Sequence, residues 1–197
     1  PSPRSRESMF PPAGSAFPHA HPVPAPALPQ FLATHPDVSI DLHLSDEVID
    51  LVGGVSRQNN TLCARAFQAS VGCVDAARGQ VLWTQTARGS VGVGGDAELL
   101  AGTESNGVVQ AWDRADGKKL WSVERFQHRR LTAPLLLGRS VIMGDDAGLV
   151  HVLSKQDGSH LNRLQTDGSG VAAAPVVAAD TLVVVTRNGG VYGFRPE

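Results

Sequence analysis

Short apolar segments separated by polar turns repeat along most of the chain. Residues 107–121, GVVQAWDRADGKKLW, contain an apolar strand, a turn closed by glycine and a second strand that ends in tryptophan. A similar stretch lies 38 residues before it and another lies 41 residues after it. A period of about 40 residues with several short strands is typical of a β-propeller blade. We therefore expect an all-β fold, a partial β-propeller of about three and a half four-stranded blades.

The repeat places four blades at about 50–87, 90–125, 131–166 and 171–197. Within each blade the apolar strands are separated by glycine and aspartate, which suit the dihedral angles of tight turns. The last blade lacks residues for a fourth strand. Because propeller rings need at least about four blades, we expect the chain to be the C-terminal end of a longer propeller.

A glycine and a tryptophan recur at equivalent places in these units. The repeat residues are Gly79, Trp83, Gly117, Trp121 and Gly158. In the third unit Asn162 stands where a tryptophan is expected. Large aromatic side chains at equivalent positions of successive units favour a structural role, in which each one docks its blade onto the next.

The N-terminal part of the chain has a different character. Residues 1–27 hold most of the 13 prolines, and proline removes backbone donors, so we expect a disordered proline-rich tail. In residues 28–49 a short helical pattern is followed by alternating apolar residues. This pattern predicts a helix–strand segment that is foreign to the propeller.

Charge and hydropathy exclude several functions. The formal net charge is −2, so we expect no attraction to nucleic acid or to anionic lipid. No run of 18 apolar residues is present, and no basic segment followed by an apolar core opens the chain. Neither a membrane-spanning helix nor a signal or lipid-anchor sequence is therefore expected in this chain. It begins with proline rather than methionine, which suggests a fragment.

The two cysteines, Cys63 and Cys73, lie on the two arms of one predicted hairpin. A two-residue turn at 68–69 would point the thiols to opposite faces, because side chains alternate along a strand. Only a three-residue loop at 67–69 would bring them face to face. We expect the shorter turn and two buried free thiols, so the redox compartment does not follow from the cysteines.

One local basic cluster, formed by His128, Arg129 and Arg130, lies between the second and third predicted blades. Two interpretations remain open for it. The cluster is either a salt-bridged or partner-binding corner, or a loop that hydrogen-bonds neighbouring blades.

The enzyme alternative is a fragment of a quinoprotein-type propeller dehydrogenase. Such an enzyme needs a calcium site and a catalytic carboxylate in its central funnel. The acidic candidates, Asp145–Asp146 and Asp157, lie beside turn glycines and are interpreted as turn formers. His151 is interpreted as a hydrogen-bonded strand residue, and no Cys/His spacing suits zinc. We therefore expect no catalytic residue, no metal and no cofactor.

The repeats resemble a known family. The stretches that carry the likeness are CVDAARGQVLW, QAWDRADGKKLW, HRRLTAPLL, VIMGDDAGLVHVLSKQDG, TDGSGVAAAPV and GGVYGF. From Asp50 to Phe194 the chain resembles the C-terminal half of BamB, the outer-membrane protein assembly lipoprotein family of Gram-negative bacteria. HRRLTAP is the most specific stretch, whereas the strand–turn–tryptophan unit is shared by all pyrroloquinoline-quinone-type repeats. Residues 28–49 instead resemble a piece of the effector domain of LysR-type regulators.

This resemblance implies a non-enzymatic scaffold on the periplasmic face of the outer membrane. Members of the family are eight-bladed propellers that bind the periplasmic domains of BamA, the central barrel-assembly protein, and help unfolded outer-membrane proteins to insert. Among the acidic positions that matter in the family, Asp50 matches, whereas Val52 stands where a second acid is expected. The candidate protein-binding residues are therefore Asp50, His128 and Arg129.

Overall fold

The computed structural model describes residues 53–67 and 69–195. Contacts divide the chain into two compact units, Pro1–Val38 and Ser39–Glu197, and every described residue belongs to the second. The predictions for residues 1–27 and 28–49, and for Asp50, lie outside the described residues. Within the described ranges, no helix is long and apolar enough to cross a membrane.

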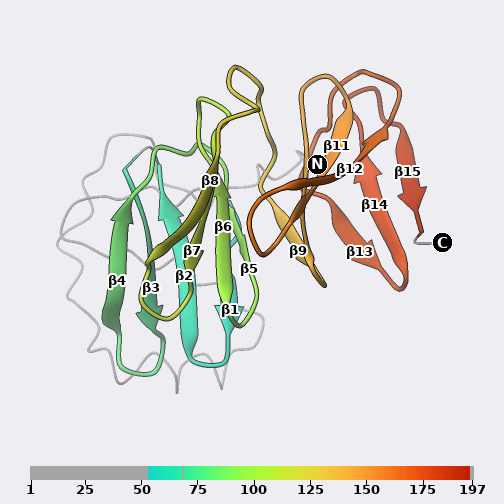
Figure 1. Ribbon diagram of the computed structural model, residues 1–197. Helices are drawn as coiled ribbons and strands as arrows, with labels where there is room; N and C mark the ends of the chain where they lie inside the picture. Colours follow the sequence, from blue (N-terminus) through green and yellow to red (C-terminus); the bar gives the residue numbers. More distant parts are fainter. Residues whose placement is uncertain (1–52, 68, 196–197) are drawn as a thin grey trace, which may run out of the picture. The chain divides into compact units, whose positions relative to one another are not determined.

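Four antiparallel sheets follow one another along the chain (Figure 1). The first contains β1 (Ser56–Gln58), β2 (Thr61–Ala66), β3 (Ser70–Asp75) and β4 (Gln80–Thr86). The second contains β5 (Val93–Gly95), β6 (Leu99–Thr103), β7 (Val109–Asp113) and β8 (Lys119–Val123). The third contains β9 (Leu135–Leu137), β10 (Ser140–Gly144), β11 (Leu149–Ser154) and β12 (His160–Gln165). The fourth contains β13 (Val176–Ala178), β14 (Thr181–Val185) and β15 (Val191–Phe194).

Each sheet is a meander in which strands adjacent in sequence are also paired, as in a propeller blade. The first strand of the second blade, β5, also contacts β1 and β9, so the first three blades meet through their first strands. The fourth sheet has three strands where the others have four. The prediction of an all-β partial propeller of about three and a half blades is therefore confirmed.

A tryptophan from the fourth strand of one blade packs on the glycine turn of the next. Trp83 on β4 is buried, and a Cβ atom at Gly117 would lie 2.5 Å from its indole ring. Its Nε1–H donates to the carbonyl oxygen of Arg114 at 2.8 Å. Gly117 also has a φ of +73°, which a residue with a side chain rarely adopts. Glycine is thus required at this turn both by the backbone conformation and by the tryptophan above it.

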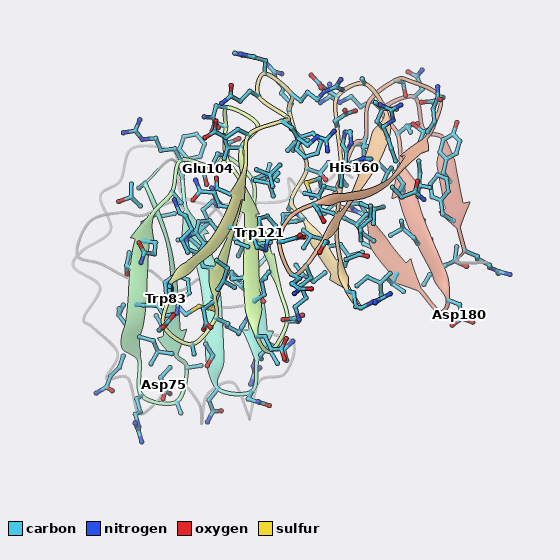
Figure 2. All side chains as sticks on the ribbon, in the orientation of Figure 1. Asp75, Trp83, Glu104, Trp121, His160 and Asp180 are labelled. Carbon is cyan, nitrogen blue, oxygen red and sulfur yellow. A yellow bond between two sulfur atoms is a disulfide. The ribbon has the colours of Figure 1, made fainter. Side chains whose placement is uncertain are left out.

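The second and third blades meet in the same way. Trp121 on β8 packs on Gly158, and its Nε1–H donates to the carbonyl oxygen of Lys155 at 2.9 Å. Trp83 and Trp121 are both labelled in Figure 2. Asn162, at the equivalent place in the third blade, is exposed, and its Oδ1 accepts the amide of Arg163. The third and fourth blades therefore meet without this tryptophan contact.

The turn residue that accepts each indole also sends its side chain back to the preceding blade. The guanidinium of Arg114 donates to the hydroxyl and the carbonyl oxygen of Ser56, both at 2.8 Å. The ammonium group of Lys155 pairs with Asp96 at 2.5 Å and with Glu98 at 2.9 Å. Each of these two interfaces therefore combines an apolar contact with a polar one.

The prediction of two free thiols is wrong, because Cys63 and Cys73 form a disulfide. Strands β2 and β3 pair with Ala66 opposite Ser70, so the loop between them has three residues and the cysteines face each other. Adding one residue to the loop changes which residues are opposite, and therefore which side chains share a face. Both cysteines are fully buried in a core that includes Trp83 and Trp112.

Removing this disulfide by the paired change Cys63→Ala and Cys73→Ala is expected to lower the free energy of unfolding by about 2–3 kcal/mol. The bridge closes a short loop and so restricts the unfolded chain. Alanines fit the site, because Ala101 and Ala111 are opposite each other at the equivalent place in the second blade. Urea unfolding followed by tryptophan fluorescence measures the change. Equal midpoints for the oxidised chain and the double variant would contradict the prediction.

Candidate protein-interaction site

The connection between β8 and β9 contains the basic cluster and begins with a tight turn. The amide of Arg129 donates to the carbonyl oxygen of Phe126 at 3.0 Å. His128 has a φ of 71°, and its amide donates to the carbonyl oxygen of Asn106 at 3.0 Å. Asn106 belongs to the turn between β6 and β7, so the connection is fastened to the second blade.

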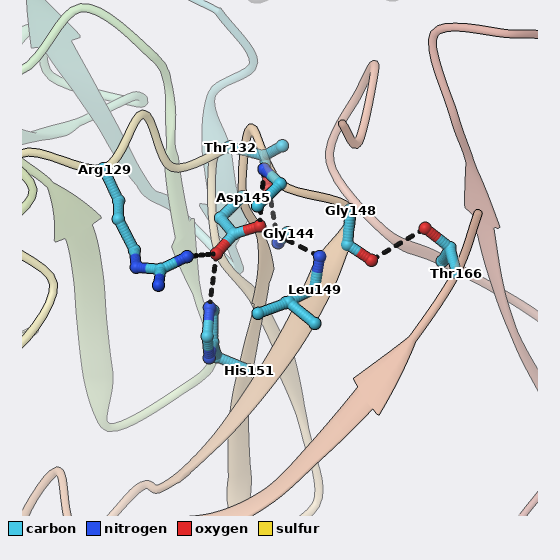
Figure 3. Close-up of polar contacts among 9 residues, drawn as sticks. Arg129, Thr132, Gly144, Asp145, Gly148, Leu149, His151 and Thr166 are labelled. Carbon is cyan, nitrogen blue, oxygen red and sulfur yellow. Dashed lines mark hydrogen bonds and ion pairs between the residues drawn. The ribbon is translucent and has the colours of Figure 1, made fainter. Parts of the chain in front are cut away.

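The carboxylate of Asp145 fastens the same connection to the third blade. Asp145 lies directly after β10, and its side chain is fully buried. Its Oδ2 accepts Nη1 of Arg129 at 2.5 Å and contacts Nε2 of His151 at 2.9 Å. Its Oδ1 accepts the amides of Ala147 and Leu149, each at 2.9 Å. Figure 3 shows these groups converging on one carboxylate.

Two further hydrogen bonds, both between Thr132 and Gly144, attach the connection to the third blade. The amide of Thr132 donates to the carbonyl oxygen of Gly144 at 2.9 Å, and the amide of Gly144 donates to the Thr132 hydroxyl at 3.0 Å. Leu131, which lies between Arg130 and Thr132 in the sequence, forms a β-bridge with Asp145. The backbone of residues 129–132 therefore has a defined position on the third blade (Figure 3).

Burial by itself would raise the pKa of Asp145. The hydrogen bonds from His151, from the amides of Leu149 and Ala147, and from Arg129 act in the opposite direction and lower this pKa from 3.8 to about 2. The carboxylate is therefore ionised at any pH at which the protein is expected to function.

The stability that this carboxylate contributes is expected to depend on pH. Because the folded pKa of about 2 lies below 3.8, the ordinary pKa of this carboxyl group, the contribution is complete above the unfolded pKa and is lost as pH falls through the folded pKa. Urea unfolding between about pH 5 and pH 2 should show wild-type stability approaching that of an Asp145→Asn variant. A stability difference that stays constant over this window would contradict the assignment.

His151 lies on β11, in the middle of the third blade, and is buried. Its ring centroid lies 4.6 Å from that of Phe126, and the guanidinium carbon of Arg125 lies 5.7 Å from the Phe126 centroid. The interpretation of His151 as a hydrogen-bonded strand histidine agrees with its contact to Asp145. Arg125, Phe126 and His151 thus form a row of contacts between the start of the connection and β11.

The members of the predicted basic cluster have different environments. Arg129 is partly exposed and is paired with Asp145, whereas His128 and Arg130 are exposed. Asp50, the third candidate, lies outside the described residues. Both open interpretations of the cluster therefore retain support: Arg129 and the His128 amide join neighbouring blades, and the other side chains are available to a partner.

The sequence interpretation did not identify Asp145 as the centre of this network. The prediction of a turn former agrees with the two amides that donate to Asp145, but this residue also pairs with Arg129 and contacts His151. Equivalent positions, 41 residues apart, hold Glu104 and Thr186, which contact Arg65 at 3.1 Å and Asp167 at 2.9 Å. Aligning the repeat on this turn position would have drawn attention to Asp145.

No group of three or more His, Cys, Asp or Glu residues is placed to hold a metal ion within the part of the chain that the structure describes. Asp157, the other acidic candidate, accepts the amide of Ser159 at 3.0 Å and its hydroxyl at 2.8 Å. These contacts are those of a turn residue.

Comparison with known proteins identifies relatives. The family model for outer membrane protein assembly factor BamB matches residues 32–123 and 106–197. The BamB protein of Burkholderia pseudomallei is 44% identical over 152 residues, which cover 77% of this chain and 40% of that protein. The BamB protein of Bordetella pertussis is 31% identical, over 76% of this chain and 39% of that protein.

Solved structures agree with these matches. BamB from Moraxella catarrhalis superposes with a TM-score of 0.66 at 25% identity, over 71% of this chain and 41% of that one. The designed protein Ika4 superposes with a TM-score of 0.68 at 18% identity, which shows the fold alone. The family match begins at residue 32, within the segment 28–49, for which the LysR-like origin stays a prediction. The chain spans about 40% of the length of the curated relatives it matches, and it belongs to the family of the outer membrane protein assembly factor BamB, with pyrroloquinoline-quinone-like propeller repeats.

Proposed function

We propose that this chain is part of a non-enzymatic scaffold that serves outer-membrane protein assembly at the periplasmic face of the outer membrane. Its partners are the periplasmic domains of BamA and, through that complex, unfolded outer-membrane proteins. Family membership supports the role in assembly. The buried disulfide is consistent with an oxidising compartment such as the periplasm.

One observation carries the assignment of a contact region. The buried carboxylate of Asp145 pairs with Arg129 and holds the connection between β8 and β9 in place. His128 and Arg130, on the same connection, stay exposed. A loop that is already ordered loses little conformational entropy when a partner binds. Exposed cations on such a loop favour fast and selective association with an acidic surface.

The acidic turn residues also favour a binding role over a catalytic one, because their carboxylates already accept hydrogen bonds from the protein. Asp145 has both oxygens engaged by Arg129, His151 and turn amides, and Asp157 caps its own turn. A carboxylate whose oxygens already accept hydrogen bonds within its own blade is a poor candidate for the general base or the calcium ligand of a quinoprotein dehydrogenase.

The paired change His128→Ala and Arg130→Gln is expected to weaken binding of the periplasmic domains of BamA by about 5- to 30-fold, which corresponds to about 1–2 kcal/mol. Binding is measured by pull-down and by surface plasmon resonance with the full chain. The matched control is Arg139→Gln, which removes one exposed charge from the turn between β9 and β10.

Two results would count against the proposal. If the wild-type chain fails to bind these domains, the assigned partner is wrong. If the control weakens binding as much as the paired change does, the contact region is wrong. Unfolding midpoints of all variants should match the wild type, because the side chains of His128 and Arg130 are exposed.

A further inference from the structure

A cavity of about 710 Å³ lies where the four blades converge. Its wall is built from the segments that enter each blade, residues 53–54, 90–92, 130–133 and 171–174. Turn residues 103–105 of the second blade and Arg187 of the fourth complete the lining. All four blades contribute to this cavity, which we call the funnel.

The charge of the funnel wall is positive. Its cations are Arg130 and Arg187, which are exposed and form no ion pair with any residue that the structure describes. Its one acid is Glu104, labelled in Figure 2, which pairs through Oε1 with the buried guanidinium of Arg65 at 3.1 Å. The other oxygen, Oε2, accepts the amide of Arg88. The acid is thus neutralised within the protein, and the two arginines are not.

Both arginines are attached to backbone that is already held in place. Arg130 lies between Arg129, which is paired with Asp145, and Leu131, which is bridged to it. The amide of Arg187 donates to the carbonyl oxygen of Gly170 at 2.9 Å, and the preceding residue, Thr186, is bridged to Val171. A ligand therefore meets two cations whose backbone is already held, one on the connection before the third blade and one on the fourth blade.

We infer that the funnel binds an acidic, extended peptide segment of a partner protein, whose carboxylates pair with Arg130 and Arg187. Guanidinium groups bind carboxylates through paired hydrogen bonds. A single small anion would gain little here, because an exposed ion pair is screened by water and contributes little binding free energy. A segment with several carboxylates engages both arginines at once and also fills the apolar and backbone surface between them.

This inference rests on the proposed function, since it specifies the chemistry of the partner that the same connection would contact. The probe is a fluorescently labelled, capped peptide of alternating Glu and Ser residues, and the reference peptide has Gln in place of Glu. Fluorescence anisotropy with the full chain should show the Glu peptide binding at least about tenfold more tightly than the Gln peptide. Raising the salt concentration from about 0.05 to 0.5 M should remove most of this difference.

Variants locate the binding. Arg130→Gln and Arg187→Gln should each weaken Glu-peptide binding by about three- to tenfold. Arg139→Gln, the matched control outside the funnel, should leave it unchanged. Binding that is insensitive to both funnel variants, or equally sensitive to the control, would overturn the inference. Citrate that binds as tightly as the peptide would also overturn it, because the site would then recognise small anions.

The two proposals fail in distinguishable ways. If the BamA domains bind but Arg187→Gln changes neither peptide nor domain binding, the funnel is not the contact and the scaffold role stands. If the Glu peptide binds in the funnel and the BamA domains do not bind, the acidic-peptide site stands and the assigned partner is wrong.

Discussion

Replacing Trp121 by alanine is expected to lower the free energy of unfolding by about 3–5 kcal/mol. The indole is buried between the second and third blades, and it belongs to a core with Leu99, Val109 and Met143. Its removal leaves a cavity above Gly158 and deprives the Lys155 carbonyl oxygen of its donor. Both effects act on the same blade interface, so the loss exceeds that of an ordinary surface change.

Urea unfolding of the purified chain, followed by circular dichroism, measures this loss. The matched control is Leu120→Ala, the neighbouring residue on β8, whose side chain is 48% exposed. That variant should lose less than about 1 kcal/mol, because a half-exposed residue buries less apolar area. A Trp121→Ala midpoint equal to that of the control would show that the tryptophan does not dock the blades.

Replacing Asp145 by alanine is expected to have a comparable effect, about 3–5 kcal/mol. The change leaves the buried imidazole of His151 and the amides of Ala147 and Leu149 without their acceptor. Arg129 loses its partner as well, but its partial exposure lets water replace the contact. The largest part of the loss is therefore expected from the buried imidazole of His151 rather than from the pair with Arg129.

Asp146→Ala is the matched control for this change, because Asp146 is the adjacent carboxylate in the same turn and is exposed. It should alter stability by less than about 0.5 kcal/mol. A double-mutant cycle between Asp145→Ala and Arg129→Met isolates the coupling of the pair. If Asp145→Ala is as stable as Asp146→Ala, the buried carboxylate is not the centre of the network. Hydrogen exchange of the amides in residues 126–132 should also accelerate in the Asp145 variant, because the connection is no longer held.

Local patterns predicted the blades well, and the reason is physical. Each strand of a meander pairs with its neighbour in sequence. The turn residues and the alternation of apolar and polar residues within about 40 positions therefore specify most of the strand pairing. The glycine and the tryptophan recur because the first two blade interfaces need the same close approach of an indole to a turn, with Trp83 on Gly117 and Trp121 on Gly158. The apolar period, the turns and the equivalent tryptophan places could therefore be recognised before any contact was known.

The cysteine prediction failed for an equally definite reason. Whether Cys63 faces Cys73 depends on a loop that differs by one residue between the two alternatives, and composition does not distinguish a two-residue from a three-residue loop there. Strand pairing decides this, because the register of β2 and β3 places both cysteines in the core that also contains Trp83 and Trp112.

The candidate site shows the same limit over a longer distance. The basic cluster was recognisable in HRRLTAP, but nothing in that stretch distinguishes the arginine that pairs inward from the one that stays exposed. Asp145 and His151 lie 16 and 22 residues beyond Arg129. Asp145 pairs with Arg129 and contacts His151 only when the third blade forms.

The sequence by itself therefore determined the all-β class, the blade period and the family, because these depend on contacts between neighbouring strands and on residues that recur in register. Only the tertiary structure decided the disulfide, the Asp145 network and the positive funnel. Each of these depends on side chains from separate strands or blades meeting in a single orientation, which the packing of one blade against the next selects.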